Sequence, residues 1–216
     1  IGGGGNSNSA STSTLTVSGG TATITTYDIG MGSTNATTIL NLDGGTFSCT
    51  DLFYRHGTNH TTNCNGGILI FRSTSSVNSA IAFVVKSGGA IIEIASGQTQ
   101  TINSALTAGA GSSGGLTKNG AGILVLTGSN TYTGSTTINA GSIRVSKAGS
   151  GGSSTGTATF TTTSLTVDFA NITPTSGATY QFFPGSTATT GLTVSLTNAG
   201  GKTGSYNYST STLTIN

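Results

Sequence analysis

The chain has few charged residues, few prolines and cysteines, and no tryptophan. Only 6% of its 216 residues are charged, against about 25% in ordinary soluble proteins, and it has 2 Pro, 2 Cys and no Trp. Its 7 Lys and Arg are scattered singly and leave a net charge of +2, which excludes a basic patch for nucleic acid. Disorder of the highly charged kind is excluded for the same reason. No apolar run reaches the roughly 18 residues of a transmembrane helix, so we expect no membrane insertion of this chain.

Glycine, serine and threonine are abundant, and the glycines recur in a pattern. There are 35 Gly, and Ser and Thr together make up about a third of the chain. A doublet of small residues returns roughly every 22 to 26 positions, a period typical of a solenoid with one coil per repeat. The doublets are Gly19-Gly20, Gly44-Gly45, Gly66-Gly67, Gly88-Gly89, Gly114-Gly115 and Ala140-Gly141.

Short alternating patterns, typical of half-buried strands, flank each doublet. Residues two and four positions after a doublet would share one strand face, and most of them are apolar. In the fourth coil the pattern slips by one position, because Ile92 and Ile94 flank Glu93; a bulge or a changed corner would explain the slip. We therefore predict an all-β fold, with a parallel β-helix (β-solenoid) of about six coils over residues 1–148. The predicted buried column comprises Leu15, Val17, Leu40, Leu42, Leu69, Phe71, Leu124, Leu126, Ile138 and Val145.

Residues 114–147, GGLTKNGAGILVLTGSNTYTGSTTINAGSIRVSK, carry the most specific motif in the chain. The segment resembles the passenger-associated repeat of bacterial autotransporters and related exported proteins. Its matching positions are Lys118, Gly120, Gly122, Leu124, Leu126, Gly128, Asn130, Tyr132, Gly134, Thr136, Ile138, Gly141 and Val145, with Ile143 in place of the usual Leu. The resemblance implies coils of a right-handed parallel β-helix and an exported protein.

The repeat pattern ends near Gly149. The sequence GSGGSSTG is typical of a turn-rich joint, and the strand patterns that follow are shorter, more aromatic and closely spaced. We therefore predict that residues 149–216 form a smaller C-terminal β region with hairpins in an antiparallel sheet. A degenerate continuation of the solenoid is the alternative.

Both cysteines and both histidines lie in the segment CTDLFYRHGTNHTTNC, residues 49–64. We predict a disulfide between Cys49 and Cys64, since exported proteins favour such bonds and closing this loop would contribute roughly 3 kcal/mol. Free buried thiols are a second interpretation. A zinc site is the third, because Cys49, His56, His60 and Cys64 have suitable ligand types and spacings. With a disulfide, His56 and His60 would be solvated loop residues, and we expect no metal and no cofactor.

The carboxylates are too few and too dispersed to predict catalysis. Glycosidases need paired carboxylates on one face, and no phosphate loop, nucleophile elbow or HExxH motif occurs. We therefore predict that the chain is not an enzyme, with a polysaccharide-active enzyme as a remote alternative. The five acidic residues are Asp28, Asp43, Asp51, Glu93 and Asp168.

The strand patterns near both ends suggest how the chain interacts. A parallel β-helix leaves unpaired backbone groups on its first and last coils, and solenoids normally cover them with caps. Here the sequence opens into STSTLTVSGG and closes on STSTLTIN, without a charged, helical or Pro-rich cap. Such edges would add a strand from another copy, and a contact of this kind continues into a filament.

We therefore predict a structural protein of the cell surface or extracellular space, a subunit of a self-assembling fibre or surface layer. The chain starts at Ile1 without a signal peptide, so we expect it to be processed. The main alternative is an adhesin or carbohydrate-binding stalk that presents residues 49–64 or the C-terminal region to surface glycans. The predicted contacts with a further copy are Ile1, Gly2, Gly3, Tyr206, Tyr208, Leu213 and Ile215.

Overall fold

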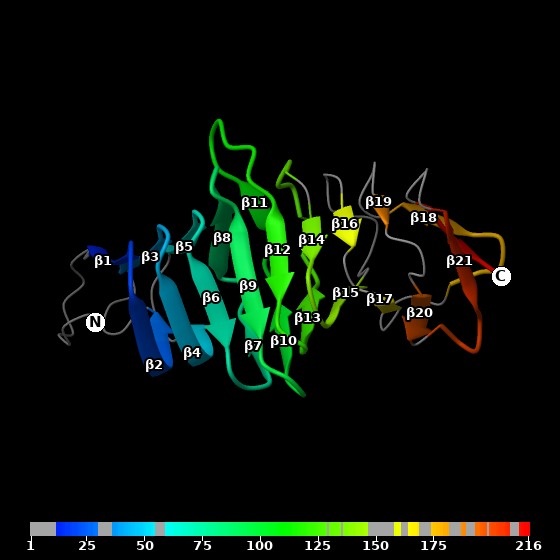
Figure 1. Cartoon of the computed structure of the whole chain (residues 1–216), viewed down its shortest axis with the longest axis horizontal. Helices are drawn as coiled ribbons and strands as arrows, with labels where there is room; N and C mark the ends of the chain where they lie inside the picture. The colour runs from blue at the N-terminus through cyan, green and yellow to red at the C-terminus, as the bar shows by residue number, and fades with distance from the viewer. Residues whose placement is uncertain are drawn as a thin grey trace.

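The computed structural model shows an elongated stack of strands (Figure 1). It describes residues 12–29, 36–54, 59–128, 130–134, 136–146, 158–160, 164–168, 174–181, 187–188, 193–197, 199–207 and 212–216. Every regular element in these ranges is a strand, so none of them is a helix that could cross a membrane.

Three parallel sheets run along the molecule and give it the architecture of a β-solenoid. The first sheet has five strands in the order β1 (Thr12–Val17), β3 (Thr37–Leu42), β5 (Asn59–Cys64), β8 (Ile81–Val85) and β11 (Leu106–Ala108). The second has eight strands: β2 (Thr21–Ile29), β4 (Thr46–Tyr54), β6 (Ile68–Phe71), β9 (Ala90–Ile94), β12 (Leu116–Asn119), β14 (Thr136–Ile138), β16 (Ala158–Phe160) and β19 (Thr187–Ala188). The third has six strands: β7 (Ser75–Val77), β10 (Thr99–Ile102), β13 (Ile123–Leu126), β15 (Ser142–Ser146), β17 (Ser164–Asp168) and β20 (Thr193–Thr197).

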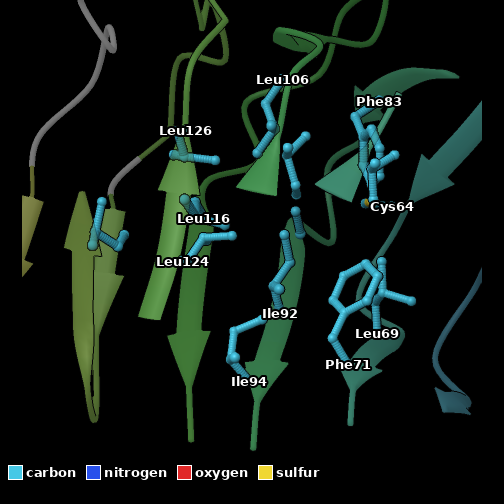
Figure 2. Packing of buried hydrophobic residues seen from close by; sticks show 14 of the residues in the cluster. Cys64, Leu69, Phe71, Phe83, Ile92, Ile94, Leu106, Leu116, Leu124 and Leu126 are labelled. Atoms are coloured by element: carbon cyan, nitrogen blue, oxygen red, sulfur yellow. The ribbon is translucent and has the colours of Figure 1, made fainter. Parts of the chain in front are cut away.

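The register of these sheets places similar residues opposite each other on neighbouring strands. Leu15 lies opposite Leu40 in the first sheet, and Leu69 lies opposite Ile92 in the second. Because side chains alternate between the two faces of a strand, this register lines up the apolar residues toward one interior. Figure 2 shows the side chains of Leu69, Phe71 and Ile92 gathered in that interior.

The predicted column is confirmed at most of its positions. Val17, Leu40, Leu42, Leu69, Phe71, Leu124, Leu126 and Ile138 are buried. Leu15 is only partly buried, because it belongs to the first described coil and has a neighbouring strand on one side alone. Val145 lies in β15, but its side chain is outside the described ones.

The slip in the fourth coil comes from a changed corner. Ile92 and Ile94 face the core, as expected from their positions on either side of Glu93. In this coil Gly89 donates a backbone hydrogen bond to Lys86 within the same turn, over 2.8 Å. The equivalent corner one coil earlier is built differently, since Gly67 donates to Leu42 in the coil below, over 3.1 Å. Cys64 pairs with Val85 before the corner and Ile68 pairs with Ile91 after it, so the corner of the fourth coil is longer by one residue before the glycine doublet and one after it.

The glycine doublets stack because neighbouring corners approach too closely for a side chain. A Cβ on Gly67 would lie 2.8 Å from the carbonyl carbon of Leu42, and one on Gly88 would lie 2.6 Å from that of Asn65. Real Cβ atoms do not approach backbone this closely, so the corners of successive coils require glycine.

The C-terminal part contains both a continuation of the parallel solenoid and an antiparallel sheet. β16 and β17 continue the parallel ladders of β14 and β15 beyond residue 148, and β19 and β20 extend them further. Antiparallel pairing occurs in a separate three-stranded sheet. Its order is β18 (Thr179–Gln181), β22 (Thr212–Ile215) and β21 (Gly204–Asn207). In Figure 1 this sheet lies at the end of the stack opposite β1 and β2.

Candidate functional site

The first described coil ends in open strand edges. β1 is the last strand of the five-stranded sheet, and β2 is the last strand of the eight-stranded sheet. The carbonyl oxygen of Val17 accepts a hydrogen bond from the amide of Asp43 over 2.9 Å, so the peptide groups of Val17 face β3. Since these groups alternate along a strand, those of Ser13 and Leu15 face β3 as well. The backbone groups of Thr12, Thr14 and Thr16 then point to a side with no partner strand among the described residues.

The interior side chains of this coil are less covered than those of the next one. Ile24 on β2 is half-buried, and so is Ala22. Their counterparts on β4, Cys49 and Phe47, are fully buried. The same apolar column runs through β2 and β4. The greater exposure of Ile24 and Ala22 therefore results from the position of β2 at the edge of its sheet.

The corner of this coil leaves room for a further coil. A Cβ on Gly45 would meet Gly19 and Val17 of the preceding coil, with the amide nitrogen of Gly19 only 2.8 Å away. The corresponding Cβ on Gly19 would have nothing within 4 Å. Gly19 is therefore a glycine of the kind found at stacked corners, but no described residue stacks on it.

A polar ladder on the outer face also ends at this edge. The side-chain amide of Asn63 donates to Oδ1 of Asn41 over 2.8 Å, and the amide of Asn41 donates to Oγ1 of Thr16 over 3.1 Å. Thr16 is the acceptor in its bond, so its hydroxyl proton can be donated to one further acceptor beyond the edge.

The predicted disulfide is not found, because Cys49 and Cys64 are both free and buried. Cys49 lies on β4 in the eight-stranded sheet, whereas Cys64 lies on β5 in the five-stranded sheet. The loop expected to hold them together is replaced by two strands. Burial raises the pKa of each thiol to about 12, and the nearby Asp51 carboxylate adds to the rise for Cys49. Both thiols are therefore protonated and unreactive at neutral pH.

The histidines of the same segment separate in the structure. His60 lies on β5, faces the interior and is buried, so it is not the solvated loop residue that we expected. It occupies a strand position opposite Thr38 and Ile81. His56 lies outside the described residues. Among the described side chains, no three His, Cys, Asp or Glu lie close enough to hold a metal ion.

The polar residues of the repeat motif are buried in the solenoid. Lys118 on β12 is fully buried, and its Nζ donates to the carbonyl oxygens of Asn119 and Gly120, each over 2.7 Å, and of Ala140 over 3.2 Å. Burial lowers the pKa of Lys118 from 10.5 to about 8, while Glu93 opposes this shift. The ammonium group therefore joins two consecutive coils.

Asn130, Tyr132 and Thr136 form a second buried polar group in the same motif. Oδ1 of Asn130 accepts a hydrogen bond from the amide of Leu106 over 2.9 Å, at the start of β11 in the coil below. The hydroxyl groups of Tyr132 and Thr136 lie 2.6 Å apart. Tyr132 is thus a core residue and is not available to stack on a sugar.

Three of the residues predicted to contact a further copy are described by the structure, and their side chains are partly or fully buried in the folded chain. Leu213 and Ile215 on β22 are buried in the core with 0% and 1% exposure, so in the folded chain they offer no surface to a partner. Tyr206 on β21 packs against the same core and is partly buried. Ile1, Gly2, Gly3 and Tyr208 lie outside the described residues.

The described carboxylates are distributed along the stack. Asp43 accepts a hydrogen bond from the side-chain amide of Asn65 over 3.0 Å, in a corner ladder. Glu93 lies on the outer face of β9, opposite Ile70 on β6 and Asn119 on β12. Asp43 thus has a structural partner, and Glu93 has no second acid opposite it in the ladder.

Sequence reasoning missed the buried lysine. The signal for Lys118 was present in the sequence. Lys118 lies two positions after the apolar Leu116, so the two side chains share the inward face of β12. An uncovered strand at STSTLTVSGG was expected from the sequence, and among the described residues the sheet order places β1 at the end of its sheet.

Of three comparisons with known proteins, one gave a match. A search of curated proteins and a search of solved structures each gave no significant match. Residues 116–145 match the family model of the passenger-associated-transport-repeat. They cover β12 to β15, including Lys118, Asn130, Tyr132 and Thr136. This repeat implies a protein that is secreted or displayed at the cell surface. The segment from β12 to β15 is thus similar to the passenger-associated-transport-repeat.

Proposed function

We propose that this chain is a structural, non-catalytic part of a surface protein and that it assembles into a fibre or surface layer. Assembly would proceed by addition of a strand or coil from a further copy to the open edges of β1 and β2. The observation that carries this proposal is that, among the described residues, β1 and β2 have a partner strand on one side only, with the half-buried Leu15 and Ile24 beside this edge.

Four features of the edge support strand addition. The amides and carbonyls of Thr14 and Thr16 have no partner strand in the described part of the chain and would offer hydrogen bonds to an incoming strand. Leu15 and Ile24 would become covered, which contributes favourably at about 25 cal/mol per Å² of apolar surface. Gly19 leaves space for close stacking of a corner, and Thr16 ends a polar ladder that has room for one more member.

A proline scan of β1 tests the proposal. Thr14→Pro removes an amide that faces the open side, so β1 keeps its hydrogen bonds to β3 and edge strands tolerate such a proline. Ser13→Pro is the matched control, because it removes an amide that faces β3. We expect Thr14→Pro to leave the thermal unfolding temperature of the dilute monomer close to that of the unmodified chain and to abolish filaments in electron micrographs.

Two results would argue against the proposal. If Thr14→Pro assembles as well as the unmodified chain, the β1 edge is not the contact. If the unmodified chain stays monomeric at high concentration, the fibre proposal fails, and binding of the purified chain to a glycan array would favour the adhesin alternative.

A further inference from the structure

The chain contains the same seven-residue segment twice, apart from one conservative change. Residues 11–17 read STSTLTV, and residues 209–215 read STSTLTI. The first segment forms β1, from Thr12 onward. The second contains β22, which is described from Thr212 to Ile215.

The two segments lie in different environments. β1 is the edge strand of a parallel sheet, and its Leu15 is partly exposed. β22 is the central strand of the antiparallel sheet, between β18 and β21, and its Leu213 is fully buried. One short sequence is thus compatible with both a parallel and an antiparallel neighbour.

We propose that the strand which completes the open edge of β1 is β22 of a second copy, added in parallel. Leu213 would lie opposite Leu15, and Thr214 opposite Thr16. This inference rests on the proposed function and names the donor strand and its register.

Each position of the donor fits the acceptor chemically. Leu213 and Ile215 would extend the interior columns that run from Leu15 to Leu40 and from Val17 to Leu42. Near-identical strands stacked in parallel register place apolar side chains on apolar ones and hydroxyls on hydroxyls.

The polar ladder fixes the same register. Thr16 already accepts the side-chain amide of Asn41, so its hydroxyl proton can be donated to Oγ1 of an incoming Thr214. A shift by one residue would place the interior face of the donor outward and would bury its threonines.

Release of β22 from its own sheet costs free energy, and this cost sets the rate of assembly. β22 must leave β18, with which it pairs over three residues, and β21, with which it pairs over four. In the proposed register, the four described residues of β22 would form four parallel residue pairs with residues 14–17 of β1. Because donor and acceptor are different strands, the contact is head-to-tail and does not close on itself, so it continues into a filament. Assembly by this route is slow, since it requires opening of the C-terminal sheet.

Disulfide trapping between two different variants tests the register. Thr16→Cys and Thr214→Cys are prepared separately and mixed under oxidising conditions, so that only an intermolecular contact can join the new thiols. In the proposed register the two residues lie directly opposite each other, and we expect a covalent heterodimer. Mixing Thr16→Cys with Thr212→Cys is the control, because a two-residue offset separates the Cα atoms by more than the roughly 7 Å that a disulfide spans. The unmodified chain controls for Cys49 and Cys64.

A lock on the donor strand gives an independent measurement. Ser205 and Thr214 lie opposite each other in the antiparallel pair of β21 and β22, so Ser205→Cys combined with Thr214→Cys would hold β22 in its own sheet. We expect the oxidised double variant to lose assembly and the reduced one to regain it.

The outcomes separate this inference from the proposed function. Filaments that form without the Thr16–Thr214 crosslink, or that form despite the lock, overturn the strand exchange and leave the fibre proposal standing. A chain that forms neither filaments nor crosslinks at any concentration overturns both.

Discussion

Nζ of Lys118 donates a hydrogen bond to the carbonyl oxygen of Ala140, 22 residues further along the chain and one coil away, over 3.2 Å. The same ammonium group also binds the carbonyls of Asn119 and Gly120. The lysine of the repeat motif therefore holds the corners of consecutive coils together, and its role is structural.

Replacing Lys118 with Met should destabilise the chain. The change leaves three carbonyl oxygens without their donor, and we expect the free energy of unfolding to fall by about 2 kcal/mol at pH 7. Chemical denaturation of the dilute monomer measures the loss. An unchanged unfolding midpoint would show that the three hydrogen bonds contribute nothing to stability.

The stability contributed by Lys118 should rise with pH between about 8 and 10.5. In this range the unfolded chain keeps the lysine proton and the folded chain has released it, so the unfolded state binds more protons and stability rises. Cys49 and Cys64 act in the opposite direction, because their raised pKa values favour unfolding as the pH passes the value of a free thiol. The informative quantity is the difference in unfolding free energy between the unmodified chain and Lys118→Met, which should increase. A difference that stays constant or decreases would contradict the lowered pKa.

Placing a carboxylate in the core should be strongly destabilising. Leu126 on β13 is 1% exposed, and Leu126→Asp should cost several kcal/mol because the charge would be buried without a partner. Ser76→Asp on β7 is the matched control, since Ser76 is exposed and belongs to the same sheet. We expect its effect to stay within about 0.5 kcal/mol in urea unfolding. Similar effects of the two changes would contradict the assignment of inner and outer faces.

Both cysteines should react only after unfolding. Their burial and raised pKa values predict no alkylation of the native chain at pH 7.5 and two labelled thiols in denaturant without reductant. Intact mass measurement counts the labels. Absence of labelling in denaturant would restore the disulfide that we predicted from the sequence.

Two corner glycines should respond differently to alanine. Gly67→Ala places a Cβ against the backbone of Leu42 and should cost about 2 kcal/mol or more. Gly19→Ala meets nothing within 4 Å, so the dilute monomer should keep its stability. In an assembly, however, the new methyl group would face the added coil as a Cβ on Gly45 would face Gly19. Gly19→Ala should therefore weaken filament formation, and unimpaired filaments would show that no coil stacks on this corner.

The solenoid was predictable from particular residues because its repeat is local. The doublets and the alternating residues around Leu40 and Leu124 specify a corner and two strand faces within a few positions. The slip at Ile92 and Ile94 was readable for the same reason. Residues 158–197 were harder to predict, because their parallel partners are not marked by a doublet.

The candidate site was less accessible to sequence reasoning. Cys49 and Cys64 share a segment with two histidines, which favoured a crosslinked loop, yet β4 and β5 place the thiols in separate sheets. Leu213 has the pattern of an edge strand, but it is buried because β22 has neighbours on both sides. These outcomes depend on contacts between distant segments, which local patterns do not encode.

Sedimentation velocity of the purified full chain over a range of concentrations, with electron microscopy of the same samples, tests the proposed assembly most directly. We predict growth from monomer to filaments as the concentration rises. The midpoint should change little between low and high salt, because the contact consists of backbone hydrogen bonds and uncharged side chains rather than exposed ion pairs. A chain that sediments as a monomer at every concentration, with no filaments in the micrographs, would contradict the proposal.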